Sequence, residues 1–149
     1  MKYKVIAVGK LKREFIKAGC LFYSKRLTSL TSLGLKEIKA IKGSQASQRE
    51  SMALLDASEG FTVSLDEKGM LRTSQELAEH VTKLEHRGVS LLNLLIGGAD
   101  GHSHELKARV DESWSLSPLT LPHELARLVL LEQLYRVETI RAGHPYHRE

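Results

Sequence analysis

The sequence predicts an α/β fold, with a parallel sheet and helices packed on both of its faces. Segments typical of short strands alternate along the whole chain with segments of helical periodicity. Residues 89–96 are nearly all apolar, as expected of a strand covered on both faces. The 149 residues contain no linker, internal repeat or low-complexity tract. We therefore expect a single domain over residues 1–149, with the element order β-α-β-α-β-α-β-α-β-α.

In the first half of the chain, three predicted strands are separated by two predicted helices. Gly34 and Gly43 flank the second strand, and Gly9 follows the first. The first helix carries four apolar residues roughly on one side: Phe15, Ala18, Phe22 and Leu27. The predicted strands cover residues 3–8, 35–41 and 60–65, and the predicted helices cover residues 15–27 and 47–58.

In the second half, the helices are marked by their capping residues. Thr73 and Glu76 form a capping-box pair before a helix that ends at Gly88. Ser103 suits the start of a short helix, and Pro122 opens the final helix, which reaches about residue 140. The remaining strands are predicted over residues 89–96 and 114–116.

Composition indicates an ordinary globular protein of the cytoplasm. Hydrophobic residues make up 42% and charged residues 27% of the chain. No apolar stretch approaches the roughly 20 residues of a membrane span, and the start lacks a signal-peptide pattern. Cys20 is the single cysteine, so no intramolecular disulfide is possible. We expect no membrane association.

Charge is distributed unevenly along the chain. Residues 1–57 contain 12 Lys plus Arg and 4 Asp plus Glu, a balance of +8, whereas the remaining 10 basic and 14 acidic residues give −4. A basic front third predicts a polyanionic partner, although a solvated lysine-rich surface would look the same. The expected contacts are Lys10, Lys12, Arg13, Lys17, Lys25 and Arg26.

The final helix is apolar on nearly every side, which favours a homodimer. Its apolar residues cannot all face one core: Leu125, Leu128, Val129, Leu130, Leu131, Leu134, Val137 and Ile140. In a domain of this size, one face would pack inside and another against a second copy. The alternative is a central helix that is covered within one subunit.

Three loops at the carboxyl ends of predicted strands are candidate binding elements, because ligands of parallel α/β folds bind at that edge. Residues 65–69 form the first of these loops. Gly97, Gly98 and Gly101 could let a ligand approach backbone amides, although a tight turn is equally compatible. Residues 116–121 alternate apolar and hydroxyl side chains around Pro118, which suits an adenine ring but also a plain connector.

Polar residues on and after the final helix are the candidate catalytic groups. Glu132 and Arg136 are four residues apart and could simply form a surface ion pair. His102 with His104, and His144 with His147, lack supporting ligands, so we expect no metal site. The full polar set is His123, Glu132, Arg136, Tyr146, His147 and Arg148.

Together these segments resemble the RlmH family of SPOUT-class methyltransferases, which methylate N3 of a pseudouridine in 23S ribosomal RNA. The resemblance spans the whole chain and is loosest over residues 11–59. The matching segments are residues 5–10 (VIAVGK), 63–69 (VSLDEKG), 95–101 (LIGGADG), 113–117 (SWSLS), 119–123 (LTLPH), 132–136 (EQLYR) and 144–149 (HPYHRE).

The resemblance implies features that periodicity cannot give. The family has a deep trefoil knot in its carboxyl-terminal part, uses S-adenosylmethionine, and acts as a homodimer with the active site near the subunit boundary. Its substrate is ribosomal RNA, which we expect the assembled ribosome to present. The implied cofactor contacts are Leu65, Gly97, Gly98, Leu116, Ser117, Pro118, Leu119, Thr120 and Leu121.

For catalysis, we expect the chain's end to close over the target base. Tyr146 would stack or hydrogen-bond, and Arg148 would stabilise developing negative charge. The proton acceptor could be His147, His123 or Glu132. Two alternatives stay open: a SPOUT methyltransferase acting on transfer RNA, and a non-catalytic, ribosome-associated RNA-binding dimer.

Overall fold

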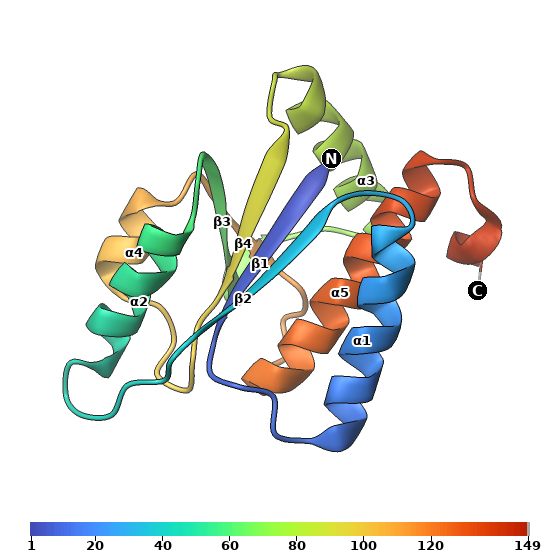
Figure 1. The fold of residues 1–149 in the computed structure, drawn as a ribbon. Coiled ribbons are helices and arrows are strands. Elements are labelled where there is room, and N and C mark those ends of the chain that lie inside the picture. Colours follow the sequence, from blue (N-terminus) through green and yellow to red (C-terminus); the bar gives the residue numbers. More distant parts are fainter. Residues whose placement is uncertain (149) are drawn as a thin grey trace.

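The computed structural model describes residues 1–148, and the side chains of residues 1–146. It contains a five-stranded sheet in the order β2-β1-β4-β3-β5, and every neighbouring pair is parallel (Figure 1). The predicted parallel α/β fold is therefore confirmed. The strands are β1 (Lys2–Val8), β2 (Leu33–Ile38), β3 (Phe61–Leu71), β4 (Leu91–Ile96) and β5 (Glu112–Ser115).

Helices cover both faces of the sheet, as the strand pattern predicts. Figure 1 shows α2 and α4 on one face and α1, α3 and α5 on the other. Successive residues of β1 point to opposite faces, so Val5 packs in the core beneath α1 and α5 while Ile6 packs with Leu54 and Leu106. The helices are α1 (Glu14–Thr28), α2 (Ala46–Ala57), α3 (Ser74–His86), α4 (His104–Arg109) and α5 (His123–Arg141), followed by the 3-10 helix η1 (Pro145–Arg148).

The predicted caps form as expected. Thr73 accepts a hydrogen bond from the backbone amide of Glu76 at 3.1 Å, and the Glu76 carboxylate accepts one from the Thr73 amide at 2.8 Å. Ser103 caps α4 by accepting from the Leu106 amide at 3.1 Å. These bonds satisfy backbone donors that the first turn of a helix leaves free.

Strand β3 runs six residues beyond the predicted end at Leu65. Its pairing with β5 shifts register between Leu65 and Met70. A Cβ on Gly69 would lie 2.7 Å from the backbone carbon of Ser113, so glycine is needed where the two strands approach. Hydrophobic periodicity misses this extension because its exposed residues lack an apolar face.

Helix α5 packs within the chain more completely than predicted. Leu130, Leu134 and Val137 are fully buried, and α5 lies against α1 and α3 (Figure 1). Gly19 of α1 lets Leu128 pack closely, because a Cβ there would lie 2.7 Å from the Leu128 side chain. One subunit therefore covers much of the apolar surface that we assigned to a second copy.

Helix α1 instead carries the outward apolar residues. Phe15 is 68% exposed, Leu21 is 56% exposed and Phe22 is 48% exposed. The core side of α1 is formed by Ile16 and Leu27, together with Cys20 and Ser24. The predicted grouping of four residues is therefore wrong in part: Phe15 and Phe22 share a side that faces outward, whereas Leu27 lies on the core side.

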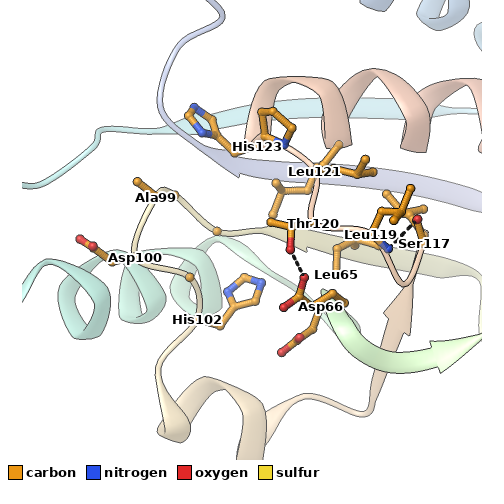
Figure 2. Close-up of a pocket in the computed structure, with 18 of the residues that line it drawn as sticks. Leu65, Asp66, Ala99, Asp100, His102, Ser117, Leu119, Thr120, Leu121 and His123 are labelled. Carbon is orange, nitrogen blue, oxygen red and sulfur yellow. Dashed lines mark hydrogen bonds between the residues drawn. The ribbon is translucent and has the colours of Figure 1, made fainter.

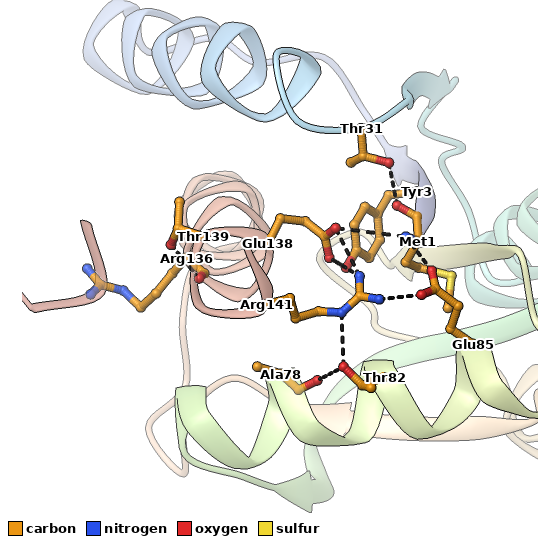
Figure 3. A network of polar contacts seen from close by, with 10 residues as sticks. All are labelled: Met1, Tyr3, Thr31, Ala78, Thr82, Glu85, Arg136, Glu138, Thr139 and Arg141. Carbon is orange, nitrogen blue, oxygen red and sulfur yellow. Dashed lines mark hydrogen bonds and ion pairs between the residues drawn. The ribbon is translucent and has the colours of Figure 1, made fainter. Parts of the chain in front are cut away.

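A network of ion pairs fastens the end of α5 to the amino edge of the sheet (Figure 3). Arg141 bonds Glu138 and Glu85, each at 2.6 Å. The amino group of Met1 lies 2.7 Å from Glu85, and the Tyr3 hydroxyl donates to Glu138 at 2.7 Å. Burial and the neighbouring Glu138 carboxylate raise the pKa of Tyr3 well above its usual value, so Tyr3 stays a donor.

No helix in the described part of the chain combines the length and apolar character required to cross a membrane.

Candidate functional site

A cavity of about 750 Å³ opens at the carboxyl edge of the sheet (Figure 2). Its walls come from the three loops singled out above, which follow β3, β4 and β5, and from the first turns of α5. Carboxyl ends of parallel strands meet at one edge, so residues far apart in sequence converge there. Within the described residues, the loops that follow β3, β4 and β5 thus form one site.

The glycine loop after β4 is packed closely from behind. A Cβ on Gly98 would lie 3.1 Å from Val8 and 3.2 Å from Glu50. The Gly101 amide donates to the Gly98 carbonyl at 3.0 Å, and Gly101 has a φ of +71°, which favours glycine. The loop is therefore a tight turn, which confirms that interpretation, and it also lines the cavity.

The segment after β5 supplies an apolar wall with fixed polar groups. The Leu119 amide donates to the Ser117 hydroxyl at 2.9 Å, and Thr120 donates to Glu67 at 2.7 Å across the cavity rim (Figure 2). The Leu119 side chain is 71% exposed. An exposed apolar side chain beside a few polar groups is typical of the lining of a small-molecule site.

His102 also lines the cavity, which sequence reasoning missed by treating it as a weak metal ligand. One ring nitrogen lies 3.2 Å from the Leu95 carbonyl oxygen. The other, Nδ1, is buried and has no partner among the described residues. Burial lowers the pKa of His102, while the nearby carbonyls of Leu95 and Leu65 act to raise it.

Glu132, Arg136 and Tyr146 form a second site that we call the tail cluster. Arg136 lies 2.6 Å from Glu132, which confirms the predicted ion pair, and the Tyr146 hydroxyl donates to the same carboxylate at 3.2 Å. The Tyr146 ring lies 4.6 Å from the Tyr135 ring and 4.9 Å from the Arg136 guanidinium. Burial, then Tyr23 and Glu132, raise the pKa of Tyr146 above its usual value, which keeps it protonated.

The candidate catalytic residues do not meet within one chain. His123 lines the carboxyl-edge cavity, whereas Glu132 is nine residues farther along α5. Nine helical residues correspond to a rise of about 13 Å and a half-turn difference in direction. Tyr146 packs near Glu132 and not at the cavity. The side chains of His147 and Arg148 lie outside the described residues.

All the predicted cofactor contacts except Pro118 line the carboxyl-edge cavity. The additional lining residues include Asp66, Asp100, His102 and Ala126. Lys107 pairs with Asp66 at 3.1 Å on this wall. In the described part of the chain, no three His, Cys, Asp or Glu side chains are placed to share a metal ion.

Comparisons with known proteins agree on one family. A sequence profile described as "Predicted SPOUT methyltransferase" matches residues 1–147. A relative from Thioalkalivibrio sulfidiphilus, named ribosomal RNA large subunit methyltransferase H, is 41% identical over 100% of both chains. A relative of the same name from Thermus thermophilus is 42% identical, covering 99% of each chain.

A solved structure has the same fold. A probable methylase family protein from Haemophilus influenzae aligns with a TM-score of 0.58 and 10% identity, covering 97% of this chain and 69% of the other.

Proposed function

The chain belongs to the RlmH family of SPOUT methyltransferases, and on this premise we propose that it methylates N3 of a pseudouridine in 23S ribosomal RNA, on the assembled ribosome. The carboxyl-edge cavity carries the proposal, because it unites the three loops that the family resemblance assigns to the methyl donor. Action in the cytoplasm and a carboxyl-terminal trefoil knot belong to the same proposal.

The cavity suits S-adenosylmethionine. Its Leu119 and Leu121 side chains offer apolar walls for a flat ring. Gly97 and Gly98 leave the cavity side of their loop free of side chains, so a ligand can reach the backbone. When bound, S-adenosylmethionine supplies an electrophilic methyl group on its sulfonium.

His123 is the proton acceptor in this proposal. A pseudouridine N3 must lose its proton as the N–C bond forms, so a base within reach accelerates the step. Glu132 is poorly suited, because its oxygens already accept from Arg136, Gln133 and Tyr146. His123 lines the cavity from the start of α5 and makes none of these bonds.

The active site is completed by a second copy of the chain. The tail cluster lies away from the cavity of its own subunit, so Tyr146 and Arg148 would reach the base from the other subunit of a homodimer. Tyr146 would contact the base, and Arg148 would stabilise charge on its carbonyl oxygens. The outward Phe15 and Phe22 of α1 support the dimer, since a monomer would leave them in water.

The decisive experiment measures methyl transfer from labelled S-adenosylmethionine to ribosomes from cells that lack this protein, and maps the modified nucleotide. We expect label at one pseudouridine of 23S RNA, and none with a transfer RNA pool. Label in transfer RNA alone would favour the transfer RNA enzyme. Calorimetry that detects no S-adenosylmethionine binding would favour a non-catalytic RNA-binding dimer.

A further inference from the structure

A second depression lies between the end of β2 and α2, and we call it the cationic groove. It encloses about 560 Å³. Ile38, Ile41 and Ala53 give it an apolar lining, and three cations border it: Lys39, Lys42 and Arg49. Residues 39–41 were predicted to belong to the second strand, but β2 ends at Ile38, and residues 39–42 line the groove.

The groove cations have no acidic partner among the described residues. The two nearest acidic residues along the chain are engaged elsewhere: Glu37 bonds Arg127 at 2.7 Å, and buried Glu50 accepts from the Ile41 amide at 2.8 Å. Three positive side chains therefore converge on one depression without a counter-charge. Such a surface attracts an anion with several charges.

The cations in and just before α1, which the sequence favoured as the RNA contacts, differ from the groove cations because several of them contact other side chains. Arg13 pairs with Glu124 at 2.8 Å, and Lys17 lies 3.3 Å from Glu14. Arg26 stacks over Phe22, 4.3 Å from the ring centre. Arg13 and Lys17 are thus partly neutralised by carboxylates, whereas Arg26 keeps its charge beside the exposed Phe22 ring. The apolar residues on this side of α1 suit a protein contact.

Helix α2 connects the cationic groove to the glycine loop of the cavity. Ser47 donates to the Gly101 carbonyl at 3.2 Å, and Ser51 accepts from the Ser103 amide at 2.9 Å. Arg49, between these two serines in sequence, borders the groove. Helix α2 therefore borders the cationic groove through Arg49 and contacts the loop that follows β4 through Ser47 and Ser51.

We propose that the cationic groove binds the phosphate backbone of the substrate RNA beside the nucleotide that is methylated. The inference rests on the proposed function and adds the surface that docks the substrate. Phosphate contacts fix the register of an RNA on a protein, and unpaired cations provide them. The apolar lining also suits a ribose or an unstacked base of an irregular RNA segment.

The test compares two triple variants that lose the same charge. Lys39→Gln, Lys42→Gln and Arg49→Gln remove the groove cations. Lys2→Gln, Lys83→Gln and Arg87→Gln remove three exposed cations from the amino edge of the sheet as the matched control. Ribosome affinity is measured for each protein at several salt concentrations, and S-adenosylmethionine affinity by calorimetry shows that each variant is folded.

We expect the groove variant to bind ribosomes more weakly, with a logarithmic salt slope shallower by about 2, because each phosphate contact contributes roughly 0.7. Between 50 and 200 mM salt, the wild-type protein should then lose about 16-fold more affinity than the groove variant. The control variant should keep the wild-type slope, and both variants should bind S-adenosylmethionine normally.

Two results would overturn the inference in distinguishable ways. If wild-type protein methylates ribosomes but the groove variant keeps the wild-type slope, the docking surface is wrong and the proposed function stands. If wild-type protein does not methylate ribosomes, the proposed function fails and the docking surface with it.

Discussion

The two edges of the sheet differ in how far their charged groups are paired. At the amino edge, charged groups satisfy one another: the Met1 amino group contacts Glu85, and Arg141 contacts both Glu85 and Glu138. At the carboxyl edge, Lys107 pairs with Asp66, but the described structure leaves the three cations of the cationic groove without acidic partners. The difference teaches that the paired charges of the amino edge stabilise the fold, and it agrees with the proposal that the carboxyl edge binds ligands.

The largest effect is expected from removing residues 146–149, which in the proposed homodimer would complete the active site of a second copy. Turnover should fall by at least about 100-fold, since charge stabilisation and base contact are lost. The Kd for S-adenosylmethionine should change only a few-fold, because Tyr146 does not line the cavity. Single-turnover methylation and calorimetry measure the two quantities.

Tyr146→Phe is the control for that truncation. It keeps the ring on Tyr135 but loses the hydrogen bond to Glu132, so its defect should be smaller. Truncated protein that methylates ribosomes at the normal rate would show that the tail has no part in the reaction.

At the amino edge, Glu138→Gln should lower the free energy of unfolding by about 3 kcal/mol, because Glu138 is the more buried carboxylate partner of Arg141 and also accepts from the Tyr3 hydroxyl. Urea denaturation measures this loss. The matched variant Glu85→Gln should cost less, because Glu85 is more exposed. Both should leave S-adenosylmethionine affinity unchanged, and a clear loss of affinity in either would contradict the division between the edges.

At the carboxyl edge, Gly98→Ala should weaken S-adenosylmethionine binding by about 10-fold, which corresponds to about 1.4 kcal/mol. The added methyl group would press on Val8 and Glu50 and displace the loop toward the cavity. Gly34→Ala is the control, since its Cβ would meet only ordinary contacts with Lys4 at 3.5 Å and beyond. Equal affinities in calorimetry would show that the glycine loop does not contact the donor.

The smallest effect concerns pH. Burial lowers the pKa of His102 below the 6.5 of an unperturbed histidine. The folded state therefore disfavours protonation of His102 more than the unfolded state does. The free energy of unfolding that neutral His102 contributes is present above pH 6.5, and it is lost as the pH falls through the pKa of His102 in the folded state. His102→Leu should lose less stability than wild type on acidification, whereas the same change at exposed His104 should leave the pH profile unaltered. Thermal unfolding across this range provides the comparison.

The sequence predicts the elements well where local chemistry determines them. The capping pair of Thr73 and Glu76 and the apolar run of β4 both form as expected. The convergence of the three loops at one edge follows from parallel strands, so that edge could be predicted as the site, whereas the strand order could not. The half-turn offset between His123 and Glu132 could have been read from their nine-residue spacing alone.

The features that could not be predicted from the sequence depend on packing between elements far apart in the chain. The outward direction of Phe15 and Phe22 depends on how α1 lies against α5, and the Met1 contact depends on where α5 ends. The cationic groove required the turn after Ile38, where an expected strand stops early. Each is a tertiary outcome that propensity and periodicity do not encode.

Amide hydrogen–deuterium exchange, with and without S-adenosylmethionine, tests the division between the edges most directly. We expect the cofactor to slow exchange in residues 65–67, 97–102 and 116–121, and to leave the ends of α3 and α5 around Glu85 and Glu138 unchanged. Protection confined to the amino edge, or no protection in the three loops at saturating cofactor, would contradict the account.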